Sequence, residues 1–287
     1  MTSNLSPMAD IEKLLLDLDV STFDHAVEMM ITNVLGSKTE ILLNILELMS
    51  KLLNIRFKSY KLYAEAFACL LNSIPKEKIP NLSEKFQNIQ PLFAGFLVST
   101  GVMQIPYILS QIGNTKMQPA LLACYDAIKE VRPNILQEID PKIANQIKSD
   151  WSKFYDVFIN DDSKQIFRLT GKYLFPFGDE LIENHPIYFA AIFGSPQIFM
   201  NLLKKGVQIK SPMFKTNVFE SLAQAAVVGG SHQILKRLDS QNIDLIAYKE
   251  TAIKYKVYDS LLFIYLKENP KSESDPKLNE TIKNMLK

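Results

Sequence analysis

The chain has 287 residues, 47% of them hydrophobic, and its 32 basic and 31 acidic residues give a net charge of +1. A chain of this length and apolar content can bury one large core or two smaller ones. The balanced charge and the lack of a clustered Lys/Arg stretch exclude the electrostatic footprint of a nucleic-acid-binding protein.

The first part of the chain is predicted to be helix after helix. Residues 1–10 are polar and lack the pattern of a secretory signal, so we expect the protein in the cytoplasm or the nucleus. An apolar stripe over residues 11–18 predicts the first helix. Ser37 and Glu40 have the spacing of a capping box. Residues 41–74 form an apolar run too long for one ordinary helix, so we predict a break at residues 56–59.

Residues 86–115 contain no charged side chain, which raises the question of a membrane span. The most apolar part, residues 92–110, has about the length that a bilayer requires. However, Pro91, Gly101 and Pro106 divide this segment, which favours two helices buried in a soluble core and packed on residues 41–71. A membrane span is the alternative. Further helices are expected at residues 118–131 and 141–158, the last capped by Asp140.

Residues 185–206 follow the order that a pair of stacked helices requires. Pro186 suits the first turn of a helix, because its missing N–H has no partner there anyway. Gly194 can adopt the positive φ that ends this helix, and Ser195 can cap the next one. Gly206 can close the pair in the same way.

Further copies of this pattern recur near the period of about 33 residues that stacked helix pairs show. Residues 226–238 form a second copy, with Gly230 at the turn. Residues 252–262 form a third, in which Lys256 replaces the turn glycine. Residues 158–167 could supply an opening pair with an aspartate cap. We therefore expect stacked helix pairs here, with no sheet beyond loop tips.

These copies resemble ankyrin repeats. His185 takes the place of the usual threonine, and Tyr188 that of the histidine that braces the loops. The residue pattern of positions 252–262 resembles that of the divergent ankyrin-like domain of unknown function found in very large protein families of parasitic protists. Residues 44–71 resemble the helical region that often precedes such repeats.

The resemblance implies an all-α fold with a helical N-terminal domain, followed by a short solenoid of degenerate ankyrin-like helix pairs. The expected boundaries are 1–149 for the helical domain, 150–270 for the repeats and 271–287 for a polar C-terminal tail. Stacked pairs leave a groove formed by the first helices and the loops between repeats. The implied function is a non-enzymatic scaffold that binds a protein of unknown identity.

The expected protein-binding residues precede the turn of each first helix or lie in the loops beside it: Asn184, Ile192, Phe193, Val228, Lys254 and Tyr255. Ile192 and Phe193 are apolar where the pattern predicts exposure. Either they form an exposed contact patch or the chain's own N-terminal helices cover them, and the sequence leaves both readings open.

The sequence contains no Gly-rich phosphate loop, His-Glu-x-x-His, Cys-x-x-Cys or Gly-x-Ser-x-Gly motif. Cys69 and Cys124 are expected as buried free thiols. Asp161 and Asp162 fit a helix cap and a turn better than a metal site. Structural or exposed positions are expected for the three histidines, His25, His185 and His232. We expect no catalytic residue, cofactor or metal. The alternatives are an adaptor or effector subunit whose N-terminal domain recruits an enzyme, and an uncharacterised helical enzyme.

Overall fold

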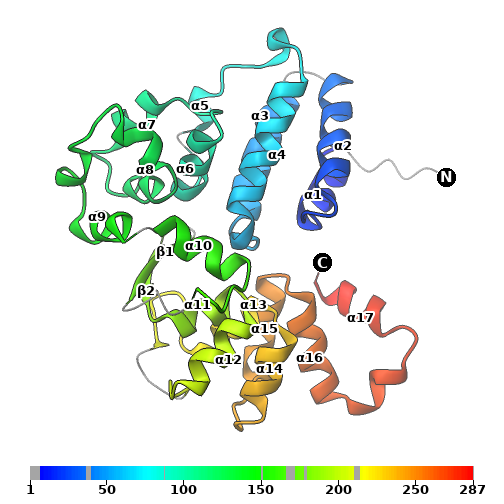
Figure 1. Cartoon of the computed structure of the whole chain (residues 1–287). Coiled ribbons are helices and arrows are strands. Elements are labelled where there is room, and N and C mark those ends of the chain that lie inside the picture. The colour runs from blue at the N-terminus through cyan, green and yellow to red at the C-terminus, as the bar shows by residue number, and fades with distance from the viewer. Residues whose placement is uncertain are drawn as a thin grey trace. The chain divides into compact units, whose positions relative to one another are not determined.

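A computed structural model of the chain describes residues 7–36, 40–86, 88–149, 151–165, 172–177, 180–209 and 214–286. Over these residues the protein is mostly helical, with one two-stranded sheet (Figure 1). The chain divides into two compact units, one of residues 1–151 with 176–179 and one of residues 152–175 with 180–287. Ser37 of the expected capping box lies outside the described residues.

The helices of the N-terminal unit are α1 Pro7–Leu16, α2 Phe23–Leu35, α3 Glu40–Leu52, α4 Tyr60–Ser73, α5 Ser83–Phe86, α6 Pro91–Ser99, α7 Ile105–Gln111, α8 Leu121–Lys129 and α9 Pro141–Lys148. They pack mainly with the next helix but one along the chain, as α1 does with α3, α2 with α4, α4 with α6 and α6 with α8. The predicted break in the long apolar run is confirmed, since only a 3-10 turn, η1 Phe57–Ser59, lies between α3 and α4. The Arg56 guanidinium donates to the Leu18 carbonyl at 2.7 Å and holds this turn.

The uncharged segment forms two short helices, α6 and α7, and no helix in the described part of the chain is long and apolar enough to cross a membrane. Helix α6 packs on α4, as predicted, and on α8. A Cβ at Gly95 would lie 2.1 Å from the Ala120 carbonyl oxygen, so the backbones touch there. The prediction of two buried helices is wrong for α7, which buries only Ile108.

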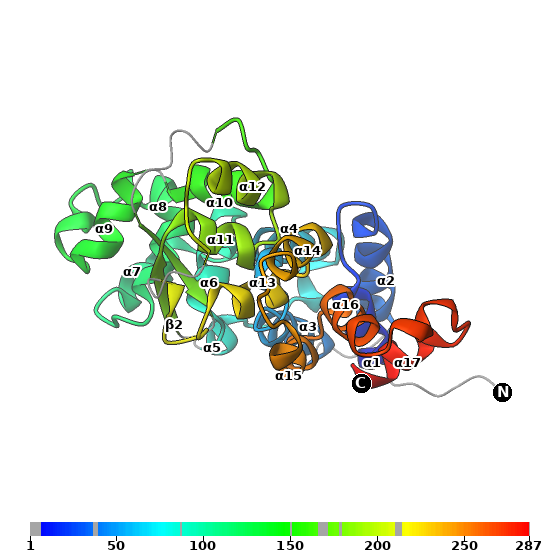
Figure 2. The same cartoon turned by 90° about the horizontal axis from the view of Figure 1, so that it is seen from below.

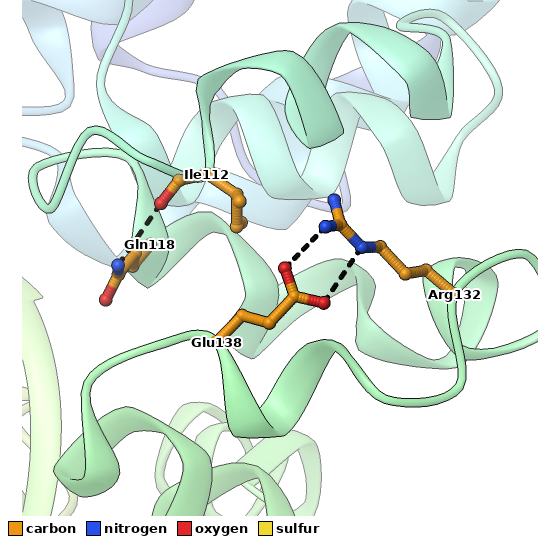
Figure 3. A network of polar contacts seen from close by, with 4 residues as sticks. All are labelled: Ile112, Gln118, Arg132 and Glu138. Atoms are coloured by element: carbon orange, nitrogen blue, oxygen red, sulfur yellow. Dashed lines mark hydrogen bonds and ion pairs between the residues drawn. The ribbon is translucent and has the colours of Figure 1, made fainter.

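Polar contacts fix the loops around α8 (Figure 3). The Gln118 amide donates to the Ile112 carbonyl at 3.2 Å and accepts from the Asp140 N–H at 2.9 Å. Arg132 and Glu138 face each other, and the guanidinium holds both carboxylate oxygens (Figure 3). The predicted Asp140 cap is confirmed, because its carboxylate accepts from the Lys142 N–H at 2.7 Å.

A helix and a hairpin precede the helix pairs, and most of their residues belong to the C-terminal unit. Helix α10 Trp151–Ile159 precedes the strands β1 Tyr173–Phe177 and β2 Glu180–Asn184. The expectation of no sheet in this region is therefore wrong. The physical reason is aromatic packing: the Tyr173 ring stacks on Phe154 with centroids 4.5 Å apart, and Phe175 stacks on Tyr155.

Three helix pairs follow the hairpin: α11 Pro186–Ile192 with α12 Pro196–Lys204, α13 Leu222–Gly229 with α14 His232–Asp239, and α15 Lys249–Lys254 with α16 Tyr258–Glu268. First helices contact first helices, in the order α11, α13, α15. Second helices contact second helices, in the order α12, α14, α16 (Figure 2). The chain ends with a 3-10 turn, η8 Pro270–Ser274, and α17 Leu278–Met285. The segment expected as a polar tail thus contains a helix.

Each first helix is followed within two residues by a residue with a left-handed backbone. Gly194 has φ 64°, Gly230 has φ 74°, and Lys256 adopts φ 51° where glycine is missing. Asp161, which follows α10, has φ 49°. The sequence predicted these turns correctly.

The predicted Ser195 cap is wrong. The Ser195 hydroxyl donates instead to the Phe158 carbonyl at 2.7 Å. The Asp161 carboxylate caps α12 in its place, accepting from the N–H groups of Gln197 at 2.9 Å and Ile198 at 3.0 Å. The side chains of Asp161 and Ser195 therefore connect the end of α10 with the start of α12.

Candidate functional site at the loop edge

The structure buries four of the six predicted contact residues: Asn184, Ile192, Phe193 and Val228 are each at most 4% exposed. The expected exposure of Asn184 and Val228 is wrong, and of the two readings left open for Ile192 and Phe193 the exposed contact patch is wrong. The Phe193 ring meets Phe175 at 4.9 Å, Phe158 at 5.9 Å and Tyr155 at 6.0 Å between centroids. The aromatic side chains that cover Phe193 thus come from α10 and β1. Both elements precede the three helix pairs along the chain, and neither belongs to the residues 1–149 that the sequence offered as a cover.

The first helices also pack too closely to present their turns to a partner. Gly229, which precedes the turn of α13, is buried, and a Cβ there would lie 1.9 Å from the Ala191 carbonyl oxygen. All seven residues of α11 are buried. Among the described residues, α11 and the turn end of α13 therefore leave no open groove between them.

Lys254 and Tyr255 are the two predicted contact residues that reach solvent. Lys254 is exposed and Tyr255 is half-buried. The Lys254 ammonium lies 5.3 Å from the centroid of the Tyr255 ring. That ring also makes an edge contact with Phe219, at 5.8 Å. These contacts hold the Tyr255 ring at the edge where loops join successive pairs.

Tyr188 links α11 to the loop before α13. Its hydroxyl lies 3.1 Å from the Thr216 hydroxyl, and Thr216 Oγ1 accepts from the Phe219 N–H at 2.9 Å. Its ring is 6.5 Å from that of Phe219. Tyr188 thus braces the loop before α13.

A second set of bonds joins the start of α13 to the next pair. The Ser221 hydroxyl caps α13 by accepting from the Gln224 N–H at 3.1 Å, and it donates to the Tyr248 hydroxyl at 2.8 Å. The Gln224 amide donates to Thr251 Oγ1 at 3.2 Å and accepts from the Glu220 N–H at 2.7 Å. The spacing Ser221-x-x-Gln224 is a capping-box pattern that the sequence analysis missed.

We call these side chains together the loop edge: Tyr188, Thr216, Phe219, Ser221, Gln224, Tyr248, Thr251, Lys254 and Tyr255. Tyr188, Phe219 and Thr251 are buried beneath it, whereas the other six reach solvent in whole or in part. Burial raises the pKa of both Tyr188 and Tyr255. The Asn217 amide, beside the loop edge, donates to the Glu180 carboxylate of the hairpin. The members of the loop edge that reach solvent therefore offer neutral hydrogen-bonding groups, the rings of Tyr248 and Tyr255, and one lysine.

The remaining candidates for chemistry have structural or exposed positions. Nowhere in the described ranges do His, Cys, Asp and Glu side chains form a group that could hold a metal ion. His185 caps α11 through Nδ1, which accepts from the Ile187 N–H at 3.2 Å, and burial lowers its pKa. Asp162 fixes a turn through the Lys164 N–H, as expected. His25 and His232 are exposed.

The expectation for the two cysteines holds for one of them. Cys124 is buried, and burial raises the pKa of its thiol to about 12. Cys69 is exposed, so its predicted burial is wrong. Apolar neighbours along α4 suggested burial, but the solvent-facing side of the helix includes this position.

A search of protein-family models, of curated proteins and of solved structures found no match for this chain.

Proposed function

We propose that residues 150–270 are a short solenoid of degenerate ankyrin-like helix pairs and that they act as a non-enzymatic protein-binding module. The observation that carries this proposal is the ordered contact of first helices with first helices and of second helices with second helices. The left-handed turns at Gly194, Gly230 and Lys256 and the bracing role of Tyr188 support it.

The contact surface in this proposal is the loop edge. Tyrosine supplies a large contact area with little conformational freedom to lose, which is why it is frequent among residues that dominate binding energy. The contacts of Tyr255 with Phe219 and Lys254 fix its ring before a partner arrives. Such preorganisation reduces the entropic cost of association.

The chain offers a matched control for this surface. Tyr125 of α8 is half-buried, and the exposed Lys129 lies with its ammonium 5.9 Å from the ring centroid. This Lys/Tyr pair repeats the chemistry of Lys254 and Tyr255 in the other unit. Replacing either pair by alanine removes the same atoms.

The test is quantitative affinity capture from the native cells with three forms of the protein. We expect the wild type and the Lys129→Ala/Tyr125→Ala variant to recover the same protein in a stoichiometric amount. The Lys254→Ala/Tyr255→Ala variant should lose it by about tenfold or more, since two contact side chains are removed. Equal recovery by all three forms, with unchanged thermal melts, would contradict the proposal.

A further inference from the structure

His185 connects the hairpin to the first of the three helix pairs. It follows β2 directly and precedes Pro186, the first residue of α11. Because proline has no N–H, the Ile187 N–H is the first donor that this helix presents. It donates to His185 Nδ1 at 3.2 Å, and Ile187 is completely buried. Water therefore cannot replace the imidazole as acceptor unless the backbone opens there.

This hydrogen bond requires a neutral imidazole. Nδ1 accepts a hydrogen bond only without a proton, so the neutral ring carries its proton on Nε2. Protonation turns Nδ1 into a donor that faces the Ile187 N–H, and the imidazolium no longer fits the cap. His185 is half-buried, so its ring can turn towards solvent and leave the Ile187 N–H without an acceptor. Uptake of one proton therefore removes the cap of α11.

Among the described residues, no charged group holds a proton on His185. Burial is the cause that lowers its pKa, and it favours the neutral ring in the folded protein. Strand β1 and helix α13 contain no charged residue. The charged groups on the other elements around α11 are Glu180 and Glu183 of β2, Lys153 and Asp156 of α10, Lys204 of α12, and Lys215 and Glu220 of the loop before α13. None of them contributes to the shift, and phenols take no part because they are neutral in acid.

The first turn of α11 also positions the side chain that braces the next loop. The Tyr188 N–H donates to the His185 carbonyl at 2.9 Å. The Tyr188 hydroxyl lies 3.1 Å from that of Thr216, which accepts from the Phe219 N–H at 2.9 Å. The cap is thus connected to residues 216–219 through Tyr188, and a change in the first turn of α11 reaches this loop.

We propose that His185 is an acid-sensitive cap. At neutral pH its imidazole closes the first turn of α11, and in acid the protonated ring leaves, so that this turn and the loop of residues 216–219 open together. Because the folded protein holds the pKa of His185 below the ordinary value of about 6.5, the stabilisation is complete above that pH. It is lost as the pH falls below about 6.5. This inference stands whether or not a partner binds the loop edge.

The test compares amide protection at about pH 7.5 and about pH 5 in three proteins, corrected for the intrinsic exchange rate at each pH. His185→Asn places an amide oxygen that does not titrate where Nδ1 accepts, and His232→Asn makes the same change at an exposed histidine. In acid, the wild type and His232→Asn should lose protection at the Ile187 and Phe219 amides by at least about threefold. His185→Asn should retain it. Loss in all three proteins, or in none, overturns the proposal.

The amides of α16 provide an internal reference in the same experiment. Their protection in the wild type should change less than that of Ile187, because the opening is confined to the cap and the braced loop. An equal loss at α16 would mean that the whole unit unfolds in acid, and it would overturn the proposal of a local opening.

A second measurement needs no variant. In a pH titration of the wild type followed by nitrogen chemical shifts, the His185 Nδ1 signal and the Ile187 amide signal should move with the same midpoint, because one proton breaks their hydrogen bond. An Ile187 amide signal that stays in place while His185 takes up its proton would overturn the proposal.

Discussion

Lys256, after the first helix α15, and Asp161, after α10, occupy the left-handed backbone region although neither is glycine. Lys256 has φ 51° and Asp161 has φ 49°. This conformation costs most L-residues free energy, because Cβ approaches the carbonyl oxygen; aspartate tolerates it better than lysine. The two positions therefore lead to different predictions.

Replacing Lys256 by glycine should stabilise the protein by about 0.5–1 kcal/mol, because relief of the left-handed strain exceeds the added freedom of the unfolded chain. Urea unfolding would measure the change. Lys236→Gly is the control, since Lys236 is exposed inside helix α14 and glycine should cost about 1 kcal/mol there. A loss of stability in both variants would contradict the strain at Lys256.

Asp161→Asn should destabilise the protein by about 0.5–1 kcal/mol. Asparagine accepts the left-handed backbone, but it has one acceptor oxygen for the two N–H groups that Asp161 caps and no charge at the start of α12. Asp162→Asn should change the free energy of unfolding by less than about 0.5 kcal/mol, since Asp162 serves a surface turn. Equal losses of stability in the two variants would contradict the capping role of Asp161.

The residue-scale predictions from sequence succeeded where a single backbone position decides the conformation. The turns at Gly194, Gly230 and Lys256 follow from local spacing. The cap of α12 did not, because the side chain that supplies it, Asp161, lies 36 residues from Gln197. A local pattern favoured Ser195, whose hydroxyl donates to the Phe158 carbonyl instead.

At the scale of elements, the pairing of α11 with α13 depends on Gly229. A Cβ there would overlap the Ala191 carbonyl oxygen, so Gly229→Ala should force the two helices apart and cost more than about 3 kcal/mol. Gly113→Ala is the control, since nothing lies within 4 Å of a Cβ at Gly113. Thermal melts in which both variants match the wild type would contradict the close approach.

The helices were predicted better than the strands. Periodicity and proline positions predicted α3, α4 and the three helix pairs, because the residues on the buried face of an amphipathic helix recur at a regular spacing in its own sequence. The hairpin was missed because its strands depend on aromatic contacts with α10, such as Tyr173 with Phe154. The same contacts with α10 and β1 bury Phe193, and no pattern inside one repeat indicates them.

At the scale of the whole molecule, the sequence was sufficient to locate the region of the helix pairs. Which residues of that region are exposed to solvent could be determined only from the structure. Exposure depends on which elements cover a helix, and these come from distant parts of the chain. Of the six residues expected at the surface, Lys254 and Tyr255 reach solvent, and both lie on the loop edge.

The most direct measurement of the central claim is site-specific photo-cross-linking in the native cells. A photoreactive amino acid replaces Tyr255 in one form of the protein and the half-buried Tyr125 in another. The account predicts a cross-link to a protein partner from position 255 and none from position 125, because the loop edge is the binding surface. A partner that cross-links from position 125 and not from position 255 would contradict it.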